Sequence, residues 1–259
     1  MLIIFSVLTL IYFMIRLFIT DKFEKRNDIN IMKWVCLGCY LVLTISLQVA
    51  NTSKYMIELC GKANSSKAIL YTLIPNVLIF GLLIALLIGF PGWKAPFSNT
   101  LGYFAVKGSP NIGIPGIKDY FDTLMDSNID NELMKKIIQN KSLIINEITP
   151  GNFDSFIAKM DENNLLNISY DKLIELAGVK NLKDSRMQDY LDAFSSLYKS
   201  VVMKDLIAEC LWYLLTGFLV ISMIKNSVAE MECEKSKSDM ENEYKNNRGT
   251  VSAMENIKE

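Results

Sequence analysis

The sequence predicts an all-α, polytopic membrane protein with about four transmembrane helices and a small helical soluble domain inserted between the third and the fourth. Two observations carry this prediction. Of the 259 residues, 51% are hydrophobic, and they concentrate in four blocks, each close to the roughly 20 residues that a helix needs to cross a bilayer. Between the third and fourth blocks, apolar residues instead recur at spacings of three and four, which is typical of amphipathic helices around a soluble core.

The first two predicted spans cover residues 2–20 and 34–50. The first is interrupted only by Arg16, which lies about one turn from the polar end and can extend its guanidinium to the interface. The second begins at Trp34, because tryptophan favours the membrane–water interface. A cleaved signal peptide is the alternative for the first block, but no basic residue precedes it and no small-residue cleavage site follows before Asp21.

The third and fourth predicted spans cover residues 69–90 and 206–224, so that residues 1–90 contain three of the four. Pro75 predicts a kink in the third, whose freed carbonyl needs a neighbouring helix or water. Glu209 lies in the first turn of the fourth. Because Arg16 and Glu209 are both near span ends, we expect snorkelling or a structural ion pair, with an ion pathway as the alternative. Few other polar residues are expected to face one another across the spans, which argues against a pore.

Residues 91–116 form a predicted interfacial junction and loop, rich in aromatics, proline and glycine. Its prolines are expected to stop the third helix, and its aromatic rings are suited to the depth of the headgroups. The segment is either a docking element of fixed shape or an elbow whose aromatics only anchor the chain. The predicted interface and docking residues are Trp93, Pro96, Phe97, Asn99 and Tyr103, together with Trp34 and Trp212.

The soluble domain is predicted over residues 117–205, with helices near 119–125, 127–148, 153–163 and 170–177. Ser127 with Asp130 forms a predicted capping pair, and Ser169 a predicted N-cap. A capping box at Ser185 opens the last helix, whose apolar stripe continues into the fourth span. We expect one continuous helix over about 185–227; the alternative is a break near Lys204. The polar tail, 225–259, extends this helix briefly and then becomes disordered or dependent on a partner.

The composition excludes several classes of chemistry. The chain has no histidine, which removes the commonest general base and zinc ligand. No phosphate-binding Gly-Lys-Ser/Thr motif and no Gly-x-Ser-x-Gly nucleophile motif occurs. The net charge is −1, so no overall basic field attracts nucleic acid. We therefore expect that the protein is not an enzyme and that it has no catalytic residue, no cofactor and no metal site.

Basic residues near the spans predict the orientation. Lys22, Lys25, Arg26 and Lys33 follow or precede the first two spans, which favours an N-terminus outside the cytosol. Residues 91–205 are then cytosolic, and the 51–68 loop and the tail lie on the other side. Cys60 and Cys233 share that side and are able to pair if it is oxidising.

Within the junction, residues 92–103, GWKAPFSNTLGY, resemble a segment in membrane proteins of large icosahedral nucleocytoplasmic DNA viruses. The resemblance implies a structural protein of the virion inner membrane, or a membrane-anchored minor capsid protein, located in host endomembranes during assembly. Its expected partners are the lipid bilayer and capsid or other membrane proteins, and self-association into a homo-oligomer is left open. It implies no catalytic residue. The alternative function is a channel, a transporter or a membrane-bound assembly factor without enzymatic activity.

Overall fold

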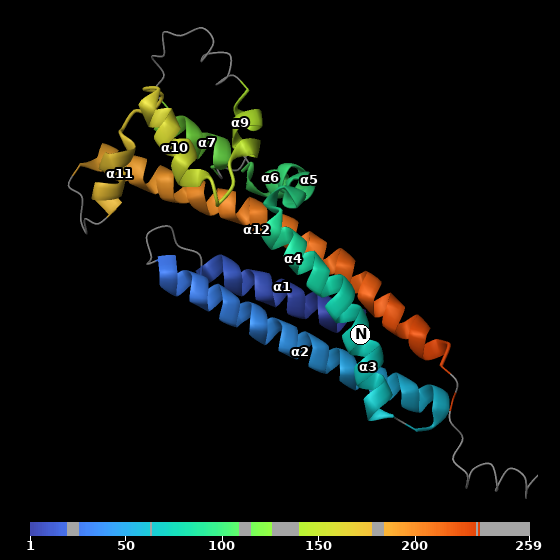
Figure 1. The fold of residues 1–259 in the computed structure, drawn as a ribbon. Coiled ribbons are helices and arrows are strands. Elements are labelled where there is room, and N and C mark those ends of the chain that lie inside the picture. The colour runs from blue at the N-terminus through green and yellow to red at the C-terminus, as the bar shows by residue number, and fades with distance from the viewer. Residues whose placement is uncertain are drawn as a thin grey trace, which may run out of the picture.

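The computed structural model describes residues 1–19, 26–62, 64–108, 115–125, 140–177, 184–231 and 233. These residues form helices and no strands, as the sequence predicts. Long helices run side by side as a bundle, and the shorter helices pack along the first half of the last long helix (Figure 1). Predictions for the 20–25 loop, the Ser127 capping pair and the tail from 234 onwards concern residues outside these ranges.

Four helical stretches in the described chain are long and apolar enough to cross a membrane. The first two are α1, Leu2–Ile19, and α2, Arg26–Cys60. The helix is longer than the predicted span 34–50: α2 continues ten residues beyond Ala50, so the expectation of a loop over 51–68 was wrong, since that segment is mostly helical. Met56, on this added stretch, is fully buried against Ala68 and Val228, and this packing explains why the helix does not stop at the polar residues that follow Ala50.

The third span consists of α3, Ser65–Pro75, the π-helical turn η1, Asn76–Gly81, and α4, Leu82–Gly89. The expected disturbance at Pro75 takes the form of this wider turn. Proline lacks the N–H that an α-helix uses, and π-turns are one way to accommodate a locally altered ladder. Next to it the Asn76 amide nitrogen donates to the Thr72 carbonyl oxygen, at 2.8 Å, so a side chain contributes to satisfying the helix carbonyls.

The third helix stops just before Pro91, as expected: α4 ends at Gly89, and Phe90 is not helical. The junction that follows is itself built from short helical segments. It contains η2, Pro91–Lys94, α5, Ala95–Phe97, the π-helical η3, Ser98–Gly102, and α6, Tyr103–Val106. Pro91 and Pro96 each stand in the first turn of a short helix, where the missing N–H would have had no intrahelical partner. At Gly102 the junction approaches the last helix so closely that a Cβ would lie 2.5 Å from the Lys204 carbonyl oxygen.

The soluble domain is built from α7, Ile117–Leu124, α9, Lys141–Glu147, α10, Phe153–Glu162, and α11, Tyr170–Ala177. These helices surround a hydrophobic core to which the last helix contributes Phe194, Leu197 and Val201. Of the helix predicted over 127–148, the described part is α9, which ends at Glu147 ahead of the predicted proline stop.

The last helix, α12, runs unbroken from Ser185–Ala229, as predicted, and at 45 residues is about 67 Å long. Its N-terminus differs from the expected capping box at Ser185, because the N-cap is Asp184. The Asp184 carboxylate accepts a hydrogen bond from the Arg186 backbone N–H at 3.0 Å. Along its length α12 buries Val201 in the domain core and Val202 in the bundle core, and Tyr198 packs against both cores. One helix therefore packs in the core of the domain and in the core of the bundle, and joins the two.

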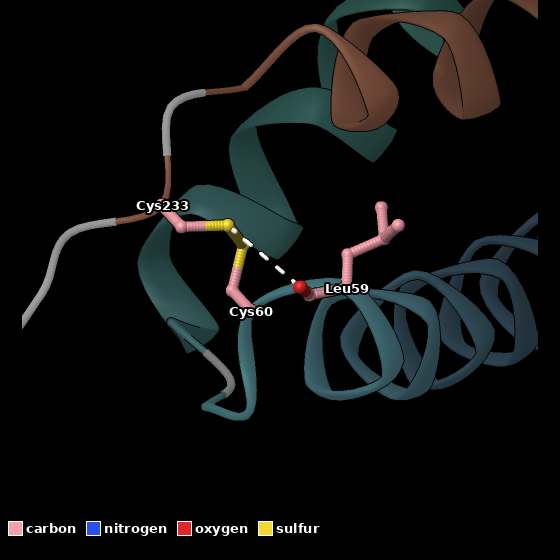
Figure 2. The surroundings of a disulfide bond; sticks show 3 residues. All are labelled: Leu59, Cys60 and Cys233. Carbon is pink, nitrogen blue, oxygen red and sulfur yellow. Dashed lines mark hydrogen bonds between the residues drawn. A yellow bond between two sulfur atoms is a disulfide. The ribbon is translucent and has the colours of Figure 1, made fainter.

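At the opposite end of the bundle, a disulfide joins Cys60, the last residue of α2, to Cys233, shortly after α12 (Figure 2). Their Cα atoms are 5.4 Å apart. The two cysteines therefore lie at the same end of the spans, as their expected pairing requires.

Candidate functional site

A line of polar side chains lies inside the bundle, and the expectation that the spans hold almost no facing polar residues was wrong. Tyr40, Thr44, Gln48 and Thr52 are all buried on α2. The Tyr40 and Thr9 hydroxyls lie 2.9 Å apart, the Asn76 amide donates to the Gln48 amide oxygen at 2.6 Å, and Thr72 donates to Thr52 at 3.1 Å. These bonds cross between helices, so the line connects α2 to α1 and to the third span.

The spacing of this line is a signal that the sequence contains. Its four members on α2 are each four residues apart, which places them on one face of the helix. Towards the domain, aromatic rings continue the same interior: Tyr12 stacks on Tyr40 with ring centroids 4.5 Å apart, and Tyr213 packs edge-on against Phe80 and Phe13.

Beyond the aromatic layer, at the domain-facing end of the bundle, four charged side chains form a connected cluster. Arg16 on α1 donates to Glu209 on α12 at 2.5 Å, so of the two expected alternatives, snorkelling or an ion pair, the structure shows the ion pair. Lys94 of the junction donates to Asp205 at 2.5 Å and lies 3.9 Å from the second Glu209 oxygen. All four side chains are only 12–16% exposed. Because opposite charges in a poorly solvated site stabilise one another only when they stay together, the cluster holds α1, η2 and α12 in register.

Lys204 makes a second polar connection, which sequence reasoning missed. It is 1% exposed, and its ammonium donates to the carbonyl oxygens of Ile145 at 2.9 Å and Asn146 at 3.3 Å. Those carbonyls belong to the last turn of α9, where helices leave acceptors without intrahelical partners. The same ammonium donates to the Asn99 side chain at 3.3 Å, so one buried lysine connects α12, α9 and the junction.

The predicted interface residues fall into three groups. Trp93, Phe97 and Trp212 meet: the Trp212 indole N–H donates to the Trp93 carbonyl oxygen at 2.9 Å, and the Trp212 and Phe97 ring centroids are 5.2 Å apart. Asn99 and Tyr103 instead face the domain, Asn99 through Lys204 and Tyr103 by packing against the domain core.

The remaining two of these residues are exposed. Trp34 is 60% exposed on α2, and Pro96 is exposed while its carbonyl oxygen accepts a hydrogen bond from the Thr100 hydroxyl at 2.5 Å.

A cavity of about 560 Å³ lies between the charged cluster, the adjoining ends of the spans and a turn of the soluble domain. Trp34 and Lys33 line it from α2, the four charged residues of the cluster line it from the other helices, and residues 149–152 line it from the domain. Deeper along the spans its lining is apolar and aromatic: Tyr12, Leu37, Ile84, Leu87, Ile88 and Tyr213.

Comparison of this chain with protein-family models, with curated proteins and with solved structures finds no match. The function therefore has to be argued from the geometry. That geometry is a bundle of membrane-spanning helices, an interior connected by polar and aromatic contacts, and a helical domain attached to it by one continuous helix and two buried polar clusters.

Proposed function

We propose that the protein is a structural membrane component that holds its helical domain at a set height and angle above the bilayer and presents it to an overlying protein. The observation that carries the proposal is α12, which extends without interruption from the domain core into the bundle core. A flexible linker would leave the domain free to move, whereas a helix packed on both sides transmits its orientation to the domain.

The contacts around α12 support this role. A single helix could still bend where it leaves the membrane, at about Lys204 and Asp205. At that point Lys204 binds α9 and the junction, and Asp205 binds Lys94. The two residues are adjacent in sequence, and their side chains bind different neighbouring segments. These contacts therefore oppose bending of α12 at this point.

The resemblance of residues 92–103 motivates the particular setting: a virion inner-membrane or minor capsid component that links membrane and protein shell. Exposed apolar side chains on the domain, Leu143 at 64% and Ile174 at 45%, offer contact surface for such a partner. In this setting the partner is a shell protein, and the bilayer is the second binding partner.

Cross-linking of intact particles or native membranes, followed by mass spectrometry, tests the proposal. Links from Lys118, Lys159 or Lys172, all on the described domain, to one overlying protein are expected. Lys54, at the other end of the bundle, serves as the comparison and should not link to the same protein. A domain whose lysines link only within this chain would overturn the proposal.

The polar line in the bundle favours a second candidate, a channel or transporter. Tyr40, Gln48 and Thr52, however, are hydrogen-bonded to side chains of the facing helices. The cavity beside Thr44 and Gln48 has a volume of only about 10 Å³, roughly the space of one water molecule. A scaffold should give no ion flux when reconstituted in liposomes. Flux above that of empty liposomes, abolished by Gln48→Leu, would favour the channel.

A further inference from the structure

We propose that the segment 90–107, which contains the short helices η2 to α6, lies in the plane of the bilayer surface and inserts one apolar face into the lipid. Leu101 and Phe104 are its principal lipid contacts, and Phe90 and Trp93 connect them to the lipid-facing surface of the third span. The inference is independent of the scaffold role, since a channel with the same segment would contact lipid in the same way.

The helices η3 and α6 have one buried and one exposed face. Ser98, Gly102 and Val106, each four residues apart, are buried, Gly102 against α12 and Val106 in the domain core. Leu101 and Phe104 lie outside this packing and are 52% and 65% exposed. Spacings of three and four residues place each set on one side of a helix, so this stretch is two-sided in the way that an amphipathic surface helix is.

The exposed face of the segment contains few polar side chains. Among residues 90–107, all of which the structure describes, the exposed positions with a polar side chain are Thr100 and Lys107. The Thr100 hydroxyl donates to the Pro96 carbonyl oxygen, and the Lys107 ammonium lies 4.4 Å from the centroid of the Phe104 ring. On the domain helix α10, by contrast, the exposed side chains are Ser155, Lys159 and Glu162. The outside of the domain therefore suits water, whereas the outside of the segment suits hydrocarbon.

The apolar face continues the lipid-facing surface of the third span. Ile88, in the last turn of α4, is 54% exposed, and Phe90 and Trp93 follow it at 62% and 50%. At Phe90 the backbone leaves the helical conformation, with φ −130° and ψ 74°, and the short helices then lie across the end of α4 and against α12 (Figure 1). No polar residue occurs between Ile88 and Trp93, so the lipid that covers the span extends without interruption over the segment.

Contacts with α12 place the segment at the level of the membrane surface. Gly102 packs at Lys204, just before the predicted start of the fourth span at residue 206, and the Phe97 and Trp212 ring centroids are 5.2 Å apart, about two turns deeper. Amphipathic helices in the membrane plane bury their apolar face about 5–10 Å into the boundary between headgroups and acyl chains. The six residues from 206 to 212 correspond to about 9 Å at the helical rise, which matches this depth.

Photolabelling of the full-length protein in phosphatidylcholine vesicles tests the proposal. One probe is a phosphatidylcholine with a diazirine in its acyl chain, and the other is a water-soluble diazirine. The lipid probe should label peptides from 90–107 as it labels those from α4 and should leave α10 unlabelled, and the water-soluble probe should give the reverse.

Two results would overturn the proposal. Labelling of 90–107 by the water-soluble probe alone would show that this face is not in lipid, and would assign it to a partner protein that the vesicles lack. Protection of 90–107 from both probes would assign the face to contact with a second copy of this chain.

A pair of double variants identifies the side chains that insert. Leu101→Ser with Phe104→Ser should lower the lipid labelling of 90–107 at least about tenfold, because the hydrophobic transfer of two large side chains is lost. Leu143→Ser with Ile174→Ser removes two exposed apolar side chains from the domain, 64% and 45% exposed, and should leave that labelling unchanged. Equal labelling of 90–107 in the two double variants would overturn the assignment of Leu101 and Phe104. If the first double variant fails to fold, the two probes on the unaltered protein still decide.

Discussion

Removal of the ion pair between Arg16 and Glu209 should destabilise the protein in a strongly non-additive way. The variants are Arg16→Met, Glu209→Met and the double replacement, which exchange charged for apolar side chains of related length. The side chains are 16% and 12% exposed and their charged atoms are 2.5 Å apart, so the pair is largely removed from water. A single replacement leaves the other charge in a poorly solvated site, whereas the double replacement leaves neither.

The contacts of the cluster set the size of the effect. Loss of one partner of a buried pair costs about 3–5 kcal/mol. After Arg16→Met, Glu209 keeps Lys94 at 3.9 Å, which moves the expected cost to the lower end, about 3 kcal/mol. Glu209→Met should cost about as much, because Arg16 keeps the Tyr12 hydroxyl at 3.4 Å and lies over the Tyr12 and Phe13 rings, 5.7 and 5.8 Å from their centroids. The double variant should lose less than the sum of the two by about 2 kcal/mol, within the range for directly contacting residues.

Equilibrium unfolding in mixed detergent micelles, followed by tryptophan fluorescence, measures these energies. Trp212 lies three residues from Glu209 and contacts Trp93, so the signal reports the domain-facing end of the bundle. The control is Lys172 with Glu175, an ion pair 2.9 Å long whose side chains are 48% and 68% exposed. Its removal should cost at most about 1 kcal/mol. Additive costs at Arg16 and Glu209, or costs no larger than those of the control, would refute the reasoning.

Three further changes test other parts of the structure. Gly217→Ala should destabilise the bundle by about 1–2 kcal/mol in the same unfolding assay, because the new Cβ would lie 1.9 Å from the Phe5 ring. Gly38→Ala is the control: no atom lies within 4 Å of its Cβ, so this variant should be neutral or stabilising. Cys233→Ser should lower the stability of the oxidised protein by about 2–5 kcal/mol, since the disulfide to Cys60 closes a loop of sequence separation 173. The stability of the reduced protein should not change. An equal loss in both states would contradict this. Lys204→Met removes the donor to the Ile145 carbonyl and should raise amide hydrogen exchange in α9 while sparing α2, and unchanged protection of α9 would show that the lysine does not hold that helix.

The long helix was predictable because its signals are local. An N-terminal cap near Ser185 and an apolar stripe without a helix breaker are readable in any window of the chain, and α12 follows them to within two residues of the expected end. The cap itself was misplaced by one residue, since Asp184 and Ser185 are both good capping residues and the backbone decides which one is used.

The polar line on α2 shows the opposite case. Tyr40, Thr44, Gln48 and Thr52 form a regular series, but a threonine or a tyrosine is tolerated singly in any span. Whether such residues form a polar line depends on the side chains that face them in the bundle. Gln48, for example, accepts a hydrogen bond from Asn76, which is 28 residues away in the sequence. The short helices of the junction depend on context in a related way: Pro91 was expected to stop the third helix and does, but a proline also suits the first turn of a new helix, and only the helix boundaries show that it does both.

The sequence by itself determined that the chain is helical, that four stretches suit a bilayer and that one helix serves both membrane and domain, because hydrophobic length and periodicity are properties of contiguous residues. Only the tertiary structure decided which polar groups meet. Lys94 pairs with Asp205 across 111 residues of sequence, and Lys204 binds Asn99 across 105. For Arg16 and Glu209, 193 residues apart, the sequence left snorkelling and an ion pair open, and helix packing decided for the ion pair. Charges in a poorly solvated site need their partners within a few ångströms, and that proximity is created by helix packing rather than by any local pattern.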